Sequence, residues 1–357
     1  MIKNLSIFLF VFVPIIYADG VEHRTVVAIS NEDSLSNNYS NPVFKRPLAD
    51  PSVLFDAVSK KYYAYGTADS WADNRGVRLV PIVESQDLVN WKYVGNAFTN
   101  ESKPKWKEGG IWAPDIVKVG DKYYLYYSIS IWHDPDPSIG VAVADSPRGP
   151  FTDKGKIIST VEIGVPNSID PFYMEDKGKK YLFWGSFHSS KNQGTYGIEL
   201  TEDGLKVKDE RKKFKIAAGD WEAVVIHKRE DYYYMFGSKG TCCEGANSKY
   251  HVLVGRSKNI FGPYLDKNGK DIAERGNGTR ILEGNDKIVG PGHNSRLFTD
   301  TDGKDWILYH GIEPKFPVLS NGVNRRLLCV DQVHWNEGWP LINNGSPSST
   351  NKTKPKL

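Results

Sequence analysis

The 357-residue sequence has little cysteine and little methionine, with three residues of each. Three cysteines leave at least one unpaired, so the sequence indicates no disulfide framework. Cys242 and Cys243 are neighbours, and either a vicinal disulfide or a pair of buried thiols fits them. No CxxC or HxxxH spacing occurs, which excludes the usual structural zinc sites. The GxSxG motif and glycine-rich phosphate loops are also lacking.

Long apolar runs are absent beyond the first residues. Behind Lys3, an apolar run from Leu5 to Tyr17 is followed by Ala18 and then by polar sequence. This run is too short for a convincing membrane span, and its pattern predicts a secretory signal peptide over residues 1–18. We therefore expect an exported protein that is periplasmic, bound to the cell surface or extracellular.

A strong excess of one charge is also lacking. The net charge is +3, with 46 basic and 43 acidic residues interspersed along the chain. This balance argues against a nucleic-acid-binding or membrane-binding surface. The sequence carries no signal for an oligomer, and we expect a monomer.

Five segments share one pattern, in which a short apolar run, a polar turn and an aromatic-rich run follow one another. They read ADPSVLFDAVSKKYYAYGT, APDIVKVGDKYYLYYS, IDPFYMEDKGKKYLFWGS, WEAVVIHKREDYYYMFGS and GHNSRLFTDTDGKDWILYHG. Their aromatic runs centre on Tyr63, Tyr124, Tyr181, Tyr233 and Trp306, so successive spacings are 61, 57, 52 and 73 residues. Repeats of this length built only of strand pattern predict an all-β protein, a five-bladed β-propeller.

Each repeat is typical of a β-hairpin, and most copies continue into a third strand. After the third strand, the similar endings SQDLVNWKYVG, SPRGPFTDKG and SKNIFGPYLDKNG suggest a fourth, outer strand. We predict that the propeller spans residues 46–343 as one catalytic domain. Residues 19–45 are expected to form an irregular leader, and the polar residues 344–357 a loose tail.

The first strand of each propeller blade lies along the central channel, so residues at the same point of the five first strands should converge. The repeats place there Asp50, Asp115, Asp170, Glu222 and His293. Asp before Pro is also common in turns, so Asp50 and Asp170 could be present for a structural reason alone. Four carboxylates and a histidine at one channel mouth nevertheless favour a chemical role, because such charges repel each other.

Paired carboxyl groups are what glycosidic bond hydrolysis requires. One protonates the leaving oxygen, and the other activates water or attacks directly. Carboxylates from different blades favour the wider separation of an inverting enzyme, roughly 6.5–9.5 Å. A third carboxylate nearby would raise the pKa of the acid. Glu222, between Trp221 and Ala223, has the partly apolar setting that suits a proton donor.

The motifs ADPSV, WAPDI, NSIDP, WEA and GPGHNS, in this order, resemble glycoside hydrolase family 43, in particular its arabinanases and arabinofuranosidases. The resemblance extends from about Arg46 to Pro340. It implies inverting chemistry with Asp50 as general base, Asp170 as the residue that modulates the pKa of the acid, and Glu222 as general acid. For Asp115 we expect a supporting role.

The resemblance also implies residues that bind substrate. Arg326 matches an arginine that reaches the innermost sugar, and Asn167 and Ser186 lie in matching segments beside the catalytic positions. Trp112 is a candidate sugar platform, although packing between blades explains it as well.

His293 matches a histidine that points at a calcium ion held mostly by waters in the central channel. Calcium prefers oxygen ligands, so a single imidazole predicts a weak site. The alternative is that His293 contacts channel waters without any metal.

The sequence therefore predicts an exported inverting hydrolase of arabinose-containing plant polysaccharide, such as arabinan or arabinoxylan, with endo-acting α-1,5-L-arabinanase as the leading activity. An exo-acting α-L-arabinofuranosidase or β-xylosidase is the near alternative. The loop EPKFPVLSNGVN and the segment GDWEAVVIH depart from the usual endo-arabinanase pattern, which leaves substrate choice open. Retaining fructan hydrolases and a non-catalytic sugar-binding propeller are more remote alternatives.

Overall fold

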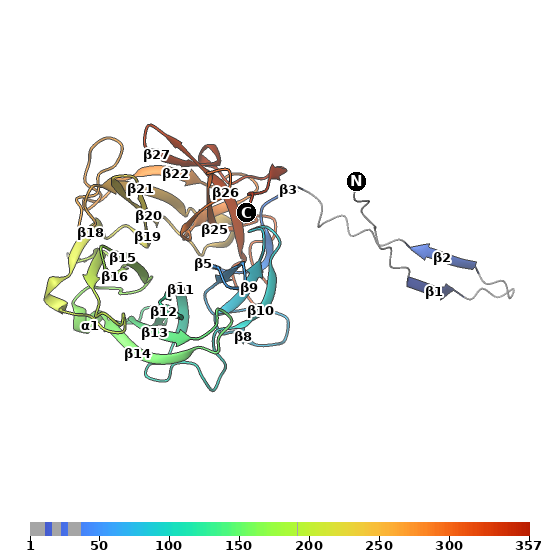
Figure 1. The fold of residues 1–357 in the computed structure, drawn as a ribbon, viewed down its shortest axis with the longest axis horizontal. Helices are drawn as coiled ribbons and strands as arrows, with labels where there is room; N and C mark the ends of the chain where they lie inside the picture. The colour runs from blue at the N-terminus through green and yellow to red at the C-terminus, as the bar shows by residue number, and fades with distance from the viewer. Residues whose placement is uncertain (1–10, 16–22, 28–36, 191) are drawn as a thin grey trace.

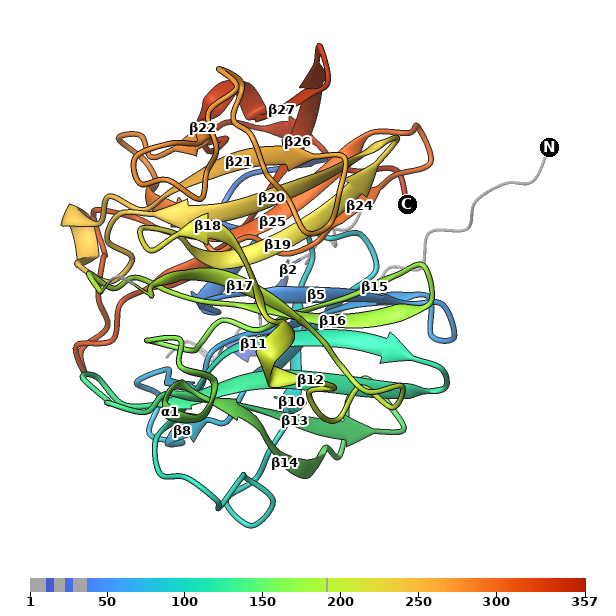
Figure 2. The same cartoon turned by 90° about the vertical axis from the view of Figure 1, so that its left-hand side faces the viewer.

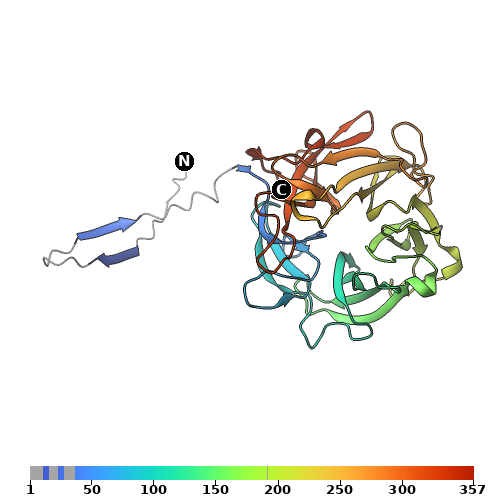
Figure 3. The same ribbon diagram turned by 180° about the vertical axis from the view of Figure 1, so that it is seen from behind.

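Five β-sheets surround a central axis (Figure 1). The structure is a computed structural model and describes residues 11–15, 23–27, 37–190 and 192–357. Figure 3 shows the same closed ring from behind. In the side view of Figure 2, the innermost strands run along the axis that Figure 1 views end-on. The predicted five-bladed β-propeller is confirmed.

The blades follow one another along the chain, each with its innermost strand first. Blade one consists of β5 (Ser52–Asp56), β6 (Lys61–Tyr65), β9 (Pro81–Ser85) and β10 (Lys92–Asn96). Blade two consists of β11 (Gly110–Val119), β12 (Lys122–Ser130), β13 (Ser138–Ala144) and β14 (Thr152–Ser159). Blade three consists of β15 (Phe172–Asp176), β16 (Lys179–Trp184), β17 (Gly194–Glu199) and β18 (Phe214–Ala218). Blade four consists of β19 (Glu222–Arg229), β20 (Tyr232–Lys239), β21 (His251–Ser257) and β22 (Thr279–Glu283).

Blade five is larger than the others. It contains β23 (Val289–Gly292), β25 (Asp305–Ile312), β26 (Arg326–Asn336) and β27 (Trp339–Ile342). Two further strands join it: β24 (Leu297–Thr299) pairs with β25, and β4 (Phe44–Pro47) pairs with β26. Because β4 precedes blade one along the chain, this pairing closes the ring between the first and last blades.

Local sequence explains the hairpins. In β15 and β16, Asp176 faces Lys179 across the two-residue turn Lys177–Gly178. Both turn residues have positive φ, 50° and 74°, as a type I′ turn requires. Outer strands are less regular. The prediction that the segment SKNIFGPYLDKNG forms the outer strand of blade four was wrong. The segment around Leu265 makes only isolated bridges, and β22 is the outer strand instead.

Aromatic residues fill the spaces between blades. Tyr63, Tyr65 and Phe151 join blades one and two in one buried cluster. Trp184 and Trp221 are fully buried in the clusters on either side of blade three. The aromatic-rich runs of the repeats are therefore mainly core, which fixes the blades against one another around the channel.

The two terminal segments differ from their predictions. Within the predicted irregular leader, β2 (His23–Val27) pairs with β1 (Val11–Ile15), and β3 (Asn38–Tyr39) pairs with β28 (Lys352–Thr353). The predicted loose tail is likewise held, by β28 and by Ser348, which is 2% exposed. Both predictions relied on low apolar content, whereas the two segments pair with each other through β3 and β28. Most of the predicted signal peptide, residues 1–10 and 16–18, lies outside the described residues.

Helix is scarce in the described residues. It comprises α1 (Thr160–Ile163) and three short 3-10 turns, η2 (Glu210–Lys212), η3 (Gly245–Asn247) and η4 (Asn343–Gly345). Two short strands, β7 (Asp69–Ser70) and β8 (Val77–Arg78), form a hairpin within blade one. None of the helices in the described part of the chain has the length and apolarity needed to cross a membrane.

Candidate active site

A residue in the left-handed conformation stands at the channel end of every blade. These residues are Asp50 (φ 54°), Ala113 (φ 42°), Asp170 (φ 59°), Ala223 (φ 57°) and His293 (φ 47°). None is a glycine, so each costs free energy, on the order of 1–2 kcal/mol. Strain of this kind gathers at functional sites, where the surrounding structure holds it in place.

This backbone pattern corrects the alignment of the five repeats. Glu222 lies one residue before the left-handed position of its blade, and Asp115 lies two residues after it. The prediction that all five acidic and histidine residues share one point is therefore wrong for these two. Sequence alignment could not reveal the offset, because the left-handed residue is alanine in both blades.

Asp115 consequently lies in a different group. It accepts hydrogen bonds from Ser52 Oγ (3.0 Å) and from the Tyr173 backbone N–H (2.7 Å), and it forms an ion pair with Arg296. Its carboxylate is buried and links blade two to blades one, three and five along the channel. Among the described residues, no hydrogen bond or ion pair joins it to Asp50, Asp170 or Glu222.

The left-handed residues are tied to the neighbouring blade by their backbone N–H groups. The acceptors are Thr67 Oγ1 for Ala113 (2.8 Å), Ser128 Oγ for Asp170 (3.0 Å), Ser238 Oγ for His293 (3.0 Å) and His310 Nδ1 for Asp50 (3.1 Å). These acceptors end the aromatic runs of the repeats. The hydroxyl and imidazole groups at these ends thus position the strained residues of the adjacent blade.

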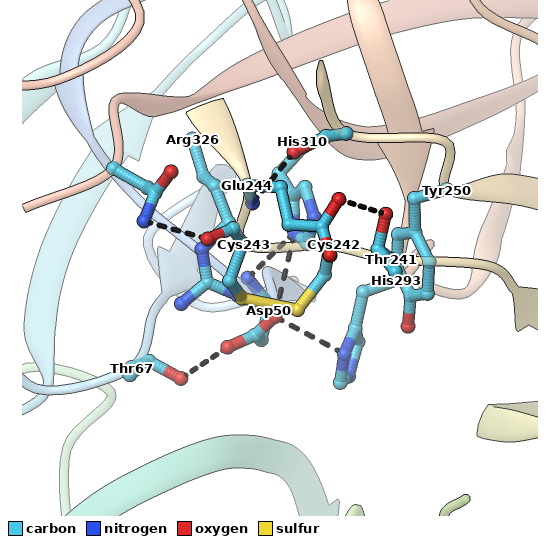
Figure 4. Close-up of a disulfide and its surroundings, with 12 residues drawn as sticks. Asp50, Thr67, Thr241, Cys242, Cys243, Glu244, Tyr250, His293, His310 and Arg326 are labelled. Carbon is cyan, nitrogen blue, oxygen red and sulfur yellow. Dashed lines mark hydrogen bonds and ion pairs between the residues drawn. A yellow bond between two sulfur atoms is a disulfide. The ribbon is translucent and has the colours of Figure 1, made fainter. Parts of the chain in front are cut away.

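Asp50 is surrounded by cations and hydrogen-bond donors (Figure 4). Arg326 Nη1 lies 2.8 Å and His293 Nδ1 3.2 Å from its Oδ1, and Thr67 Oγ1 donates to its Oδ2 at 2.5 Å. Burial alone would raise the pKa of Asp50, which is 8% exposed. Arg326 and then His293 outweigh burial and hold the pKa of Asp50 well below its usual range. This carboxylate is therefore ionised.

Glu222 has the opposite electrostatic setting. Ser186 Oγ donates to its Oε2 (2.6 Å) and Tyr250 Oη to its Oε1 (2.5 Å), but no cation pairs with it among the described residues. Burial raises the pKa of Glu222, against the opposing hydrogen bonds and the charge of His293. Tyr250 remains a donor, because burial and then Glu222 raise the pKa of its phenol well above 10.

Asp170 is influenced by the charges of both of these carboxyl groups. Its Oδ2 accepts the backbone N–H of Ala223 at 3.1 Å, directly beside Glu222. Burial, and then the charges of Glu222 and Asp50, raise the pKa of Asp170 to about 7 against the opposing effect of His293. Asp170 and Glu222 are therefore both buried carboxyl groups whose pKa values are raised.

The two histidines of blade five differ in charge. Burial lowers the pKa of His293, but the Asp50 carboxylate outweighs burial and leaves it raised. His310 is fully buried, and burial together with Arg326 lowers its pKa well below 6.5. His293 thus supports Asp50 as a cation, and neutral His310 accepts the Asp50 N–H.

The channel residues do not fit a calcium ion held by protein ligands. No group of three or more His, Cys, Asp or Glu side chains suited to a metal occurs in residues 37–190 and 192–357. The ligand expected for the ion, His293, directs Nδ1 at Asp50, so Nε2 is the nitrogen through which it could face an ion.

The remaining predicted residues fall into two groups. Ser186 and Arg326 contact Glu222 and Asp50, so they belong to the same cluster as the carboxylates. Arg326 Nε has no hydrogen-bond partner among the described residues and can donate to a ligand. Asn167 instead donates to the Phe187 carbonyl at 3.1 Å, beside Ser186.

Trp112 lies half-buried at the rim, where a second tryptophan accompanies it. Its ring lies 5.8 Å from that of Trp132, centroid to centroid, and the side chain of Trp132 is 74% exposed. The indole also covers Gly110, where a Cβ atom would lie 2.3 Å from Trp112 Nε1. Trp112 is therefore a rim residue with one edge packed on its own strand.

Sequence reasoning missed four residues of this site: Thr67, Trp132, Tyr250 and His310. Thr67 and His310 end aromatic runs, and the recurrence of a hydroxyl or imidazole there was a usable signal. Tyr250 and Trp132 lie in connections outside the repeated segments, where no pattern marks them.

Together these residues combine an ionised carboxylate with a buried carboxyl group of raised pKa. When the surroundings of two carboxyl groups separate their pKa values, the group of low pKa is suited to act as a base and the group of high pKa as an acid. A cavity in the channel, lined by Pro51, Asp170, Phe172 and His293 among others, lies beside the cluster. The arrangement suits hydrolysis of a bond whose leaving oxygen needs a proton.

Comparison with known proteins gives consistent results. The family model of Glycosyl hydrolases family 43 matches residues 39–340. An extracellular exo-α-(1→5)-L-arabinofuranosidase of Cellvibrio japonicus is 35% identical, over 74% of this chain and 80% of the relative. An extracellular endo-α-(1→5)-L-arabinanase of Bacillus subtilis is 34% identical, over 82% of this chain and 87% of the relative. Among solved structures, the α-L-arabinanase of Cellvibrio cellulosa complexed with arabinohexaose has a TM-score of 0.70 and 31% identity, over 84% and 96% of the two chains.

Proposed function

The chain belongs to glycosyl hydrolases family 43, whose members invert the anomeric centre, and from that premise we propose that it cleaves α-1,5-linked L-arabinan by endo action outside the cell. Asp50 is the general base, Glu222 the general acid, and Asp170 modulates the pKa of the acid. The products are shorter arabino-oligosaccharides.

The difference in pKa between Asp50 and Glu222 is the observation that carries this proposal. A base must be ionised before the reaction and an acid protonated. Arg326 and His293 keep Asp50 ionised, whereas burial favours the protonated form of Glu222. The reverse assignment would require Asp50 to be protonated and Glu222 to be ionised, which their surroundings disfavour.

In the proposed reaction, Asp50 removes a proton from a water molecule as the water oxygen bonds to the anomeric carbon. The bond from that carbon to the leaving oxygen breaks, and Glu222 transfers its proton to the leaving oxygen. Asp50 then holds one proton and Glu222 has lost one, so exchange with solvent restores both. Ser186 and Tyr250 orient Glu222 through its two oxygens throughout.

Asp170 acts through charge. Its carboxyl group lies against the Ala223 N–H, one residue from Glu222. As Asp170 gains negative charge, ionisation of Glu222 becomes less favourable, so the acid retains its proton nearer neutral pH. Asp170 needs no contact with the sugar for this role.

The names of the relatives support arabinan as substrate and export as destination. Both relatives named above are called extracellular, and both act on α-1,5-linked arabinose. They differ in mode, since one is named as an exo enzyme and the other as an endo enzyme. Exo action is therefore the second candidate, and the Cellvibrio japonicus relative is the observation that favours it.

Calcium enters the proposal only as an ion surrounded by water in the channel, with His293 as its nearest imidazole. No step above depends on it, because Asp50 and Glu222 carry both proton transfers. Metal analysis of dialysed protein would detect such an ion, and activity that survives a chelator would agree with the mechanism as written.

Product analysis tests the proposal. Purified protein is incubated with linear α-1,5-arabinan, with an aryl α-L-arabinofuranoside and with an aryl β-xyloside. A ladder of arabino-oligosaccharides with little aryl cleavage is the expected result. Release of arabinose alone would establish the exo alternative, xylose release would replace the substrate, and binding of arabinan without any product would overturn the hydrolase assignment.

A further inference from the structure

The turn between β20 and β21 carries a disulfide between the adjacent residues Cys242 and Cys243. Both cysteines are partly exposed. Figure 4 draws this disulfide with its surroundings, which include Asp50, His293 and Arg326. The disulfide and the proposed base thus belong to one neighbourhood.

One side of the turn is fastened to blade five. Asn324 Nδ2 donates to the Cys243 carbonyl at 3.1 Å, and Asn324 Oδ1 accepts the Gly245 N–H at 2.7 Å. Gly245 has φ +56° and lies close to Pro317, where a Cβ atom would be 3.4 Å from Pro317 Cβ. A single amide therefore fixes the turn at two points directly after the disulfide.

The same short segment of blade five also positions Arg326. The Arg326 N–H donates to the Asn324 carbonyl at 2.9 Å, and the Arg326 guanidinium pairs with Asp50. The disulfide and the arginine that supports the base are consequently fixed by neighbouring groups of one segment. Their relative position depends on very few free rotations.

The other side of the turn leads to the proposed acid. The Thr241 carbonyl accepts the N–H groups of Lys249 and Tyr250, at 3.0 and 3.1 Å. Tyr250 Oη donates to Glu222. The disulfide turn thus connects the segment that positions Arg326 beside Asp50 with the tyrosine that donates to Glu222.

The chemistry of the disulfide differs from that of everything around it. Asp50, His293 and Arg326 are charged or strongly polar, whereas disulfide sulfurs have no proton to donate and are soft and polarizable. Closing a ring between adjacent residues also constrains the unfolded chain far less than closing a long loop. Stability is therefore a weak reason for an apolar surface at this place.

A pentose offers a matching surface, because its hydroxyl groups lie on edges and its C–H groups form an apolar face. Sites for small ligands combine apolar walls with a few placed polar groups. We propose that the Cys242–Cys243 disulfide is the apolar wall of the sugar subsite beside Asp50 and packs against the C–H face of an arabinose ring. This inference rests on the proposed function, since it deepens the description of the same site.

The test measures binding without turnover. In a Glu222→Gln background, α-1,5-arabinotriose is titrated calorimetrically into the protein with the disulfide and into the Cys242→Ala/Cys243→Ala variant. Loss of an apolar contact of this size should raise Kd about tenfold. The Cys329→Ala variant removes the remaining, fully buried cysteine and should leave Kd unchanged. Equal Kd values with and without the disulfide would overturn the inference.

Kinetics separate a wall from a catalytic group. With Glu222 intact, the double alanine variant should show a KM about tenfold higher on arabino-oligosaccharides and a kcat within about threefold of the unmodified enzyme. A fall in kcat with unchanged KM would overturn the assignment, because it would mean loss of transition-state alignment alone.

Reduction offers a second route that needs no substitution. A phosphine converts the disulfide to two thiols as the phosphine takes up oxygen from water, so the denatured protein should titrate one thiol before treatment and three after it. The reduced protein should bind arabinotriose several-fold more weakly and recover on reoxidation; unchanged affinity in that form would contradict a rigid wall. Failure of the untreated, disulfide-bonded protein to bind the trisaccharide would overturn the proposed function and the sugar assigned to this wall together.

Discussion

At the scale of single residues, burial and neighbouring charge compete at each carboxyl group of the site. Burial raises the pKa of Asp50, Asp170 and Glu222 alike. Only Asp50 has cations close enough to reverse that effect, Arg326 at 2.8 Å and His293 at 3.2 Å. Of the three, Asp50 alone has a pKa lowered by its partners. This difference in pKa is the basis for proposing Asp50 as the base and Glu222 as the acid.

Replacement of the base and of the acid should separate their roles. Glu222→Gln is expected to lower kcat/KM on arabinan by about 10³-fold or more, because a poor leaving group needs its proton. On a dinitrophenyl glycoside of arabinobiose the same variant should lose less than about tenfold, since that leaving group departs unprotonated. Asp50→Asn should lose activity on both substrates, because water still needs a base. A leaving-group-independent loss in Glu222→Gln would exclude Glu222 as the acid.

The pH profile should report the raised pKa values. The acid must be protonated, so kcat/KM should fall as pH rises through the neutral region, where Asp170 and Glu222 share protons. The base must be ionised, so the acidic limb should lie well below pH 4, in keeping with the lowered pKa of Asp50.

Removal of the modulating charge should move only the basic limb. In Asp170→Asn the negative charge near Glu222 is lost, the pKa of the acid falls, and the basic limb should shift to lower pH by about one unit. The variant Asp203→Asn, at an exposed residue in the connection between β17 and β18, has the same change in net charge and should keep the original profile. An unmoved basic limb in Asp170→Asn would remove Asp170 from the proposed role.

The proposed catalytic residues stood out in the sequence because each lies in a repeated motif near the start of an innermost strand. Asp50 and Asp170 both precede Pro at the left-handed position, so their alignment was right. Asp115 was misaligned by two residues, since the WAPD motif places Ala113 at that position and leaves the carboxylate further along the strand. Backbone conformation decided this, and alanine gives no sign of it.

At the scale of elements, the strands were far easier to predict than the connections between them. Strand pattern and turn residues marked the inner hairpin of each blade, whereas the rim depends on segments that follow no period. The connection after β12 holds Trp132, which is 74% exposed and faces Trp112 at 5.8 Å. Exposed aromatic rings of this kind serve as platforms for sugars that extend beyond the catalytic residues.

Trp132→Ala should therefore affect long substrates more than short ones. Loss of one ring contact is expected to raise KM on polymeric arabinan about three- to tenfold, with kcat and the melting temperature little changed. Phe55, at the opposite end of β5 from Asp50 and 44% exposed, offers a matched aromatic control. An equal effect of Trp132→Ala on arabinobiosides and on the polymer would place this ring in the innermost subsite instead.

At the scale of the whole molecule, the ring is closed by segments far apart in the chain. β4 adds to blade five through β26, and β3 pairs with β28. Buried Asp331 reinforces the closure, since its Oδ2 accepts the N–H of Ser348 at 3.0 Å and the hydroxyl of Tyr309 at 2.6 Å. Composition predicted two loose ends here, because hydrogen bonds to existing strands leave no apolar signature.

Deletion of residues 349–357 tests how much this closure contributes. The deletion removes β28 and the hydrogen bonds that Thr301 makes with the Lys356 carbonyl, both 2.7 Å long. The loss of a few kcal/mol should lower the melting temperature by about 5 °C. Activity at 25 °C should be retained, because Asp50, Asp170 and Glu222 are supported from the channel and not from this edge.

Replacement of Lys352–Thr353 by two glycines is the milder counterpart and should lower the melting temperature by less. If the shortened protein melted unchanged but lost activity, the tail would have to act on the site itself, and the ring would be closed by β4 and β26 alone.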